Sequence, residues 1–254
     1  MGNGRTCSRT ETRLASQRFW GFAMGIDQSW ELQVIGGWQL SHNRKEIRVV
    51  LRQQRLLALL ALRGSLSRNV VAGMLWPQTT ERQASGSLRA TVCALRRKWP
   101  DLLEIGDGKL ALSRQVRLDL EHFREQISHE IHSPGRSLMA MLRRAELLPG
   151  WYEDWVIDEQ ERWTLLRLAA LERAAVRLLA NGDNDNAIDA ARTMIELDPA
   201  HEIAYQLLLR AQLADGNRAE AMRTYRDFRS MLHLEFGTEP SEKTALFLRQ
   251  SLQV

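Results

Sequence analysis

Four arginines lie within one short segment of the chain, residues 81–98 (ERQASGSLRATVCALRRK). On a helix, Arg82, Arg89 and Arg96 share one face because they are spaced seven residues apart, and Arg97 lies beside them. A guanidinium group can donate paired hydrogen bonds to a guanine edge or bind a phosphate. This face therefore offers the chemistry of nucleic-acid binding, with a solvated basic surface as the alternative.

The opposite side of the same segment is apolar, as expected of a helix that packs on a core. Its members recur at steps of four, four, three and four residues: Ala84, Leu88, Val92, Leu95 and Trp99. Thr80 or Glu81 can begin the helix, and Pro100 stands where it must end. Small side chains lie between the arginines and allow the backbone to approach a partner closely: Gly86, Ala90, Cys93 and Ala94. A basic helix with such a surface suits the major groove of DNA.

Short strands are expected before this segment and a hairpin after it. Residues 30–35 and 38–40 alternate as strands do around Gly36-Gly37, a turn follows at 41–43, and a third strand begins at 47–49. Later, residues 102–105 and 109–112 flank Gly106-Asp107-Gly108, which is a hairpin pattern.

Two further helices are expected between the strands and the basic segment. One spans about 52–62 and is stopped by Gly64, and the next begins at Ser67 and runs through Trp76. Strands, three helices and a hairpin together predict a winged helix-turn-helix. Residues 81–98 would be its recognition helix and the hairpin its wing.

The second half of the chain is almost entirely helical by pattern. Asp119 is expected to cap the first helix, which Ser133-Pro134-Gly135 ends. The predicted helices span 119–132, 136–148, 153–180, 183–197, 200–214, 217–232 and 241–252. Leu-Ala-Asn-Gly-Asp at 179–183 recurs as Leu-Ala-Asp-Gly-Asn at 213–217, which gives a period of 34 residues. This is the period of tetratricopeptide repeats, whose stacked helices form a curved binding surface.

Charge is distributed unevenly between these two halves. Residues 28–119 hold 15 Lys and Arg against 7 Asp and Glu, a net charge of +8, whereas residues 120–254 hold 16 against 22, a net charge of −6. A basic module joined to an acidic one is typical of a nucleic-acid binder with a separate protein-binding part. We therefore predict a flexible leader at 1–27, a DNA-binding domain at 28–118 and an all-α domain at 119–254. The predicted fold class is mainly α with a small antiparallel β part.

Several classes of protein are disfavoured by what the sequence lacks. The chain has no apolar run near the ~20 residues of a membrane span, and the leader has no apolar core that would make it a secretory signal. Two cysteines give neither a disulfide framework nor a metal spacing, which indicates a reducing, cytoplasmic setting. No catalytic motif and no cofactor-binding signature stands out. His122, Glu125, His129 and His132 could be imagined as a metal site, but a solvated helix face is the favoured interpretation.

Some motifs resemble those of a known family. LLALLAL at 56–62, LWP at 75–77, SLR at 87–89 and LRR at 95–97 resemble the OmpR-type winged helix of Streptomyces antibiotic regulatory protein (SARP) activators. LLPGWYEDW at 147–155, EQER at 159–162, GNRAEA at 216–221 and FGTEPS at 236–241 resemble the bacterial transcriptional activator domain that follows it there. The resemblance covers about residues 30–252.

The resemblance implies a DNA-binding transcription activator. Members of the family bind direct repeats in promoter DNA and contact RNA polymerase, and a homodimer on DNA is a further expectation. By position, Arg89, Arg96 and Arg97 match arginines of the family pattern. The chain departs from that pattern at Ser85, where many relatives have arginine, and at Cys93, where serine is usual. The target sequence therefore cannot be taken over from relatives.

The predicted DNA-binding residues have different roles. Arg89 either reads a guanine or holds a phosphate, and these alternatives stay open. Arg82, Arg96 and Arg97 are expected to bind phosphates. Ser87 and Cys93 are candidates to touch the groove, with packing as the alternative for Cys93. Arg114, after the wing, is expected to follow the minor groove or the DNA backbone, with a plain solvated arginine as the alternative.

Other residues are assigned mainly to structure. Arg52 and Arg55 are interpreted as surface residues, although they begin a helix near which phosphate could bind. The aromatic cluster Trp151, Tyr152 and Trp155 is favoured as a seam between domains over a partner site. The tryptophans expected in the core are Trp38, Trp76 and Trp99.

One alternative function stays open. The chain could be a helical-repeat adaptor between proteins, whose winged helix no longer reads DNA. The charge of +8 on residues 28–119 argues against it, because an adaptor does not need a basic winged helix.

Overall fold

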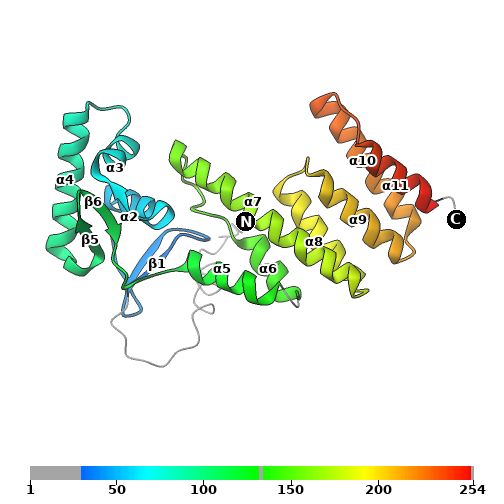
Figure 1. Cartoon of the computed structure of the whole chain (residues 1–254), viewed down its shortest axis with the longest axis horizontal. Helices are drawn as coiled ribbons and strands as arrows, with labels where there is room; N and C mark the ends of the chain where they lie inside the picture. The colour runs from blue at the N-terminus through cyan, green and yellow to red at the C-terminus, as the bar shows by residue number, and fades with distance from the viewer. Residues whose placement is uncertain (1–29, 132–133, 253–254) are drawn as a thin grey trace, which may run out of the picture.

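The structure is a computed structural model that describes residues 30–131 and 134–252. The predicted leader (1–27) and His132 lie outside the described residues. The fold is elongated, with strands and three helices at one end and a series of packed helices leading to the C-terminus at the other (Figure 1). It confirms the predicted fold class, a mainly helical chain with a small sheet at its N-terminal end.

A four-stranded sheet begins the described chain, in the order β3-β2-β1-β7. Its strands are β1 (Trp30–Gln33), β2 (Gln39–His42), β3 (Lys45–Glu46) and β7 (Val116–Leu118). The turn between β2 and β3 lies at Asn43 and Arg44, both with positive φ, and not at 41–43. No strand forms at 47–49. β7 was not predicted, and it pairs parallel to β1 beside the antiparallel strands.

The three predicted helices of the winged helix are present. They are α2 (Leu51–Arg63), α3 (Arg68–Leu75) and α4 (Glu81–Lys98). Gly64 ends α2 with a φ of 70°, which is the left-handed region that favours glycine. A single 3-10 turn, η1 (Pro100–Leu102), follows α4.

The wing is a hairpin held to the start of α3. It consists of β5 (Leu103–Gly106) and β6 (Lys109–Leu112), and β4 (Leu66–Ser67) pairs with β6 as a third strand. Asp107 and Gly108 form its tip with φ values of 48° and 72°. The Arg68 backbone N–H donates to the Gly108 carbonyl over 3.1 Å. The tip therefore lies against the N-terminus of α3.

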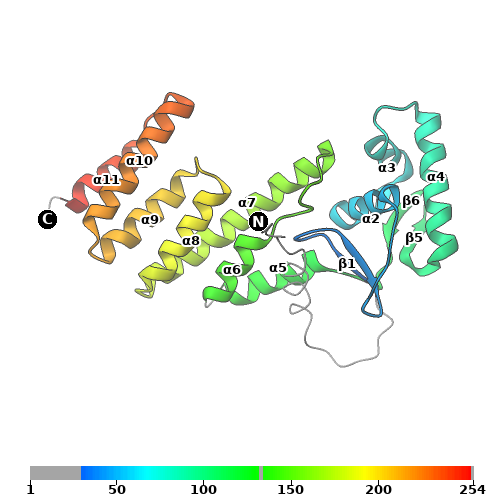
Figure 2. The ribbon, with the colours of Figure 1, turned by 180° about the vertical axis from the view of Figure 1, so that it is seen from behind.

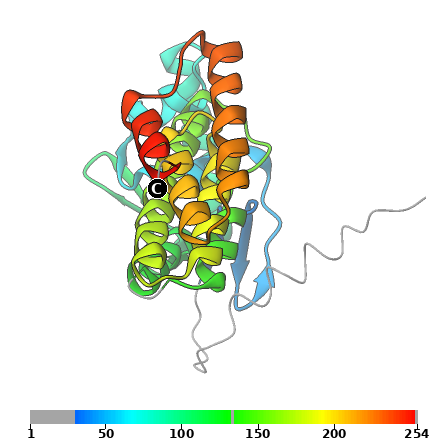
Figure 3. The same ribbon diagram turned by 90° about the vertical axis from the view of Figure 1, so that its right-hand side faces the viewer.

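The helices of the second half stack in sequence order (Figure 2). They are α5 (Asp119–Glu130), α6 (Arg136–Arg144), α7 (Asp154–Ala180), α8 (Asn184–Leu197), α9 (Glu202–Ala214), α10 (Arg218–Phe236) and α11 (Glu242–Leu252). Seen along the long axis, α10 and α11 lie in front of the other helices (Figure 3). Within the described residues, none of the helices has the length and apolar character needed to cross a membrane.

The 34-residue repeat is visible in matching turns. Gly182 and Gly216 have φ values of 75° and 76° at the ends of α7 and α9. One residue later, Asp183 and Asn217 begin the next helix, and each side chain accepts a hydrogen bond from the backbone N–H three residues on. Similar local sequences thus build the same turn twice.

α6 is shorter than predicted because the residues after it pair with the sheet. The helix ends at Arg144, not at 148. Leu147 forms an antiparallel bridge with Ile35, and the Leu148 N–H donates to the Val34 carbonyl over 2.8 Å. The backbone of Leu147 and Leu148, which would have continued the helix, instead pairs with the residues that follow β1.

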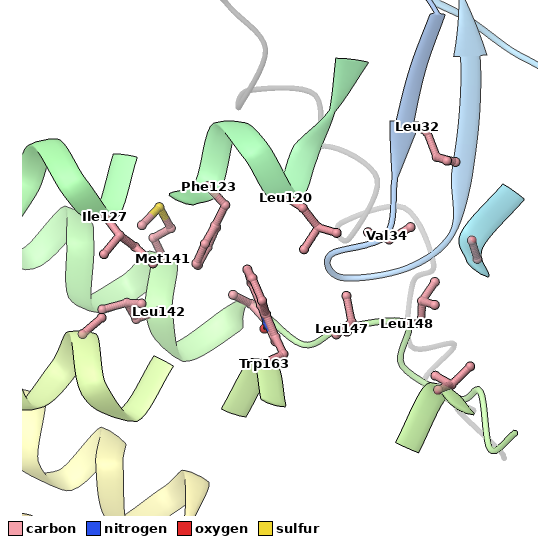
Figure 4. Packing of buried hydrophobic residues seen from close by; sticks show 14 of the residues in the cluster. Leu32, Val34, Leu120, Phe123, Ile127, Met141, Leu142, Leu147, Leu148 and Trp163 are labelled. Carbon is pink, nitrogen blue, oxygen red and sulfur yellow. The ribbon is translucent and has the colours of Figure 1, made fainter. Parts of the chain in front are cut away.

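One hydrophobic core runs through both halves. Leu32 and Val34 from β1 and its extension lie near Leu120, Leu147 and Leu148 (Figure 4). Farther along, Phe123 contacts Trp163, with ring centroids 5.0 Å apart. Because one cluster of buried residues contains members of both, the winged helix and the helical half share a hydrophobic core.

Asp119 was predicted to cap α5, and this was wrong. Leu118 holds the cap position, and the Asp119 carboxylate accepts hydrogen bonds from the Val34 and Ile35 N–H groups at 2.8–3.1 Å. Burial raises the pKa of Asp119 to about 6, although these hydrogen bonds act in the opposite direction. Its carboxylate joins the start of the helical half to the end of β1.

Candidate nucleic-acid interface

Local interactions fix both the start and the buried side of α4. Thr80 and Gln83 form a capping box, in which the Thr80 side chain accepts from the Gln83 N–H and Gln83 accepts from the Thr80 N–H. The predicted apolar members Ala84, Leu88, Val92 and Leu95 are buried, as is Thr91, whose hydroxyl donates to the Ser87 carbonyl. With one face anchored in the core, the opposite face of α4 is held in a fixed orientation.

The predicted basic face of α4 is exposed along its length. Within the described part of the chain, none of the guanidinium groups of Arg82, Arg89, Arg96 and Arg97 takes part in an ion pair or a hydrogen bond. α4 also lies at the outer edge of the molecule, far from the C-terminus (Figure 1). Four cationic donors are therefore free to bind an external anion.

The small residues predicted on this face have different degrees of exposure. Gly86 and Ala90 are exposed between the arginines, and Ser87 is half-buried. Cys93 is exposed with a free thiol, so packing in the core does not account for it. The side chains between the arginines of α4 are thus short and leave its backbone accessible.

Arg114 lies away from the wing tip. It follows β6 in the turn before β7, and its backbone N–H donates to the Glu104 carboxylate over 3.1 Å. The preceding Ser113 N–H donates to the carbonyl of Leu102, close to the end of α4. The exposed Arg114 therefore belongs with the C-terminal end of α4, whereas the hairpin tip faces α3.

Two exposed lysines on this surface were not predicted from the sequence. Lys109 is the first residue of β6, next to the wing tip, and Lys98 is the last residue of α4. The Lys98 ammonium lies 4.4 Å from the centroid of the Trp99 ring. Lys109 could have been found from its position directly after the Gly-Asp-Gly turn, where a wing reaches outward.

Arg55 was interpreted as a surface residue, and the structure corrects this. Its side chain is half-buried and pairs with Glu153, whereas Arg52 is exposed as expected. Trp151 and Trp155 pack against the core near this contact, which supports a seam, but Tyr152 is 82% exposed. The aromatic cluster is therefore divided between the seam and the surface.

The remaining aromatic predictions hold in part. Trp38, Trp76 and Trp99 are half-buried against the core, and none is fully enclosed. Trp30 is the more deeply buried residue, at 5% exposed, and its ring stacks on His42 and meets the edge of Trp99.

Comparison with known families identifies the second half of the chain. Residues 137–250 match the family model described as the bacterial transcriptional activator domain. This segment is therefore similar to a bacterial transcriptional activator domain. Together with the winged helix before it, the match supports the resemblance to SARP-like transcriptional activators that the sequence predicted. The match does not test the predicted boundaries at residues 27/28 and 118/119, which stay predictions.

A solved structure has the same fold. The structure described as Mycobacterium tuberculosis EmbR in complex with low affinity phosphopeptide superposes with a TM-score of 0.71 at 18% sequence identity. The match covers 89% of this chain and 65% of the EmbR chain. Comparison with curated protein sequences gives no match.

Proposed function

We propose that this protein is a transcription activator that acts in the cytoplasm by binding promoter DNA through α4. The observation that carries the proposal is the exposed face of α4, with four arginines that have no protein partner within the described residues. Such a helix fits the major groove, where guanidinium groups meet both guanine edges and phosphates. No catalytic role is part of the proposal.

The arginines divide the work of binding. Arg89, in the middle of the exposed face, is the candidate to contact a base. Arg82, Arg96 and Arg97 supply phosphate contacts toward the two ends of the helix, and Arg114 adds one beyond its C-terminal end. Ser87 and Cys93 border the groove-facing surface. Gly86 and Ala90 allow the backbone to come close to the base edges.

The activator domain is proposed to contact RNA polymerase. Residues 120–254 carry a net charge of −6, which keeps this half away from the DNA phosphates while residues 28–119 approach them. Two copies bound to direct repeats would form a homodimer on DNA. An adaptor without DNA affinity is the alternative.

The test is a binding titration of the full chain on duplex DNA from its own promoter region at a series of salt concentrations. We expect retardation at ~50 mM salt, with log K falling at a slope of about −0.9 per phosphate contacted. Arg97→Ala should reduce that slope by about one contact, whereas Arg173→Ala, on the exposed surface of α7, should leave it unchanged. A folded sample that binds no DNA at low salt would leave the adaptor as the remaining function.

A further inference from the structure

Arg55 contacts both the activator half and the helix-turn-helix. Its Nε lies 2.8 Å from Glu153 Oε1, directly before the first residue of α7. Its Nη2 donates to the carbonyl oxygen of Leu75, the last residue of α3, over 3.0 Å. The Arg55 and Glu153 side chains are only 24% and 28% exposed. One guanidinium group therefore bridges the N-terminus of α7 and the C-terminus of α3.

The carbonyl of Leu75 is at a position that affects α4. The last carbonyls of a helix have no partner within the helix, and a cation there is favourable. Residues 76–80 follow directly and lead to the capping box that begins α4. By holding the end of α3, Arg55 fixes the start of the turn that places the recognition helix.

A second ion pair across the same seam provides an internal comparison. Arg63 lies eight residues after Arg55 on α2. Its Nε is 2.7 Å from Glu159 Oε1, and its Nη2 is 3.5 Å from Asp158 Oδ2. Among the described residues, Arg63 has no hydrogen bond to α3 or to the turn after it. Two arginines of α2 thus pair with carboxylates at the start of α7, and the contact of Arg55 also continues to the helix-turn-helix.

We propose that Arg55 is a positioning residue for DNA recognition, through which the seating of α7 sets the orientation of α4. Glu153 holds the guanidinium group, and the guanidinium group holds the end of α3. The proposal rests on the proposed function of α4 as the DNA-reading helix. It implies that a partner engaging the N-terminus of α7 changes DNA binding without touching α4.

The first test compares Glu153→Gln with the matched variant Glu159→Gln in the full chain. Affinity is measured for the promoter site and for an unrelated duplex of equal length at the same salt. Glu153→Gln should weaken binding to the promoter site about 3- to 10-fold, the effect of removing the negative charge from one partly buried ion pair, and leave the unrelated duplex unchanged. Glu159→Gln should change neither affinity. Equal losses in the two variants would show that the seam contributes only stability.

The second test needs no DNA and separates this proposal from the proposed function. Hydrogen exchange of the backbone amides in residues 76–80 should become faster in Glu153→Gln and stay unchanged in Glu159→Gln. Arg55→Lys should also make the exchange faster, because one ammonium group cannot contact both Glu153 and the Leu75 carbonyl as the guanidinium group does. In the double variant with Glu153→Gln, the exchange should be little faster than in Arg55→Lys alone. Unchanged exchange in Glu153→Gln would overturn the positioning role even if the protein binds DNA. If the exchange is faster in Glu153→Gln but the protein binds no DNA, the positioning role of Arg55 stands and the proposed DNA binding by α4 is refuted.

Discussion

The arginines of α4 and those of the α2–α7 seam have opposite surroundings. Arg82, Arg89, Arg96 and Arg97 are exposed, whereas Arg55 and Arg63 are paired with carboxylates of the activator half. Arg167 is the extreme case at 3% exposed, and it donates to the carbonyls of Leu142 and Arg143 at the end of α6. An arginine on a helix therefore becomes part of the fold where a neighbouring carboxylate or carbonyl lacks a partner, and part of a binding surface where no such group is near.

Arg167 lies outside the α2–α7 seam, between α7 and the end of α6, and its replacement removes the most buried of these arginine contacts. Burial disfavours the charged form of Arg167 and lowers its pKa. Its N–H groups donate to two carbonyl oxygens at 2.8 Å, and these hydrogen bonds stabilise the buried charge. Arg167→Met should lower the free energy of unfolding by about 3 kcal/mol, because it leaves both carbonyls buried without a donor. Urea denaturation at neutral pH measures the change.

The control for Arg167→Met is Arg173→Met, six residues later on α7. Arg173 donates to the Ala169 carbonyl on the exposed side of the same helix. We expect its replacement to change the free energy of unfolding by less than ~0.5 kcal/mol. Similar losses in the two variants would mean that the buried contacts of Arg167 add nothing special to the fold.

The two sides also differ in how far the sequence could predict them. The exposed face of α4 depends on helical spacing, and its limits depend on Thr80 and Pro100, so local patterns were enough. Arg55 depends on Glu153, which is far away in the chain, and no local pattern connects the two. The same reason explains Asp119, whose expected local cap gave way to hydrogen bonds with Val34 and Ile35.

Backbone pairing between residues far apart in the chain also explains the two elements that were predicted wrongly, β7 and the end of α6. β7 is only three residues long and forms because β1 offers a free edge, while the end of α6 is set by the bridge between Ile35 and Leu147. The repeat was predictable because Gly182 and Gly216 require the same left-handed turn. Arg114 was correctly expected to be exposed, but its position at the far end of the hairpin required the register of β5 and β6.

Arg89 lies in the middle of the exposed arginine face of α4. Arg89→Ala should leave the free energy of unfolding within ~0.5 kcal/mol, since the side chain is exposed and has no partner among the described residues. Binding to the promoter site should weaken by about 1–3 kcal/mol, measured by fluorescence anisotropy. If Arg89 reads a guanine, the loss should disappear on a duplex with that base pair replaced. A uniform loss on all duplexes would instead assign it to a phosphate, and an unchanged affinity would remove it from the interface.

Gly86 lies on the exposed face of α4 among the arginines, where a small residue would let the backbone approach DNA. A Cβ added there meets no protein atom within 4 Å, and glycine within a helix costs ~1 kcal/mol relative to alanine. Gly86→Ala should therefore raise the free energy of unfolding by about 0.5–1 kcal/mol, and so should the matched variant Gly73→Ala in α3, where the added Cβ is equally unobstructed. The two should differ in DNA binding, since Gly86 lies between the arginines and Gly73 does not. Weaker promoter binding in Gly86→Ala alone would indicate close approach of the α4 backbone to DNA, and equal affinities would mean that the arginine side chains span a wider gap.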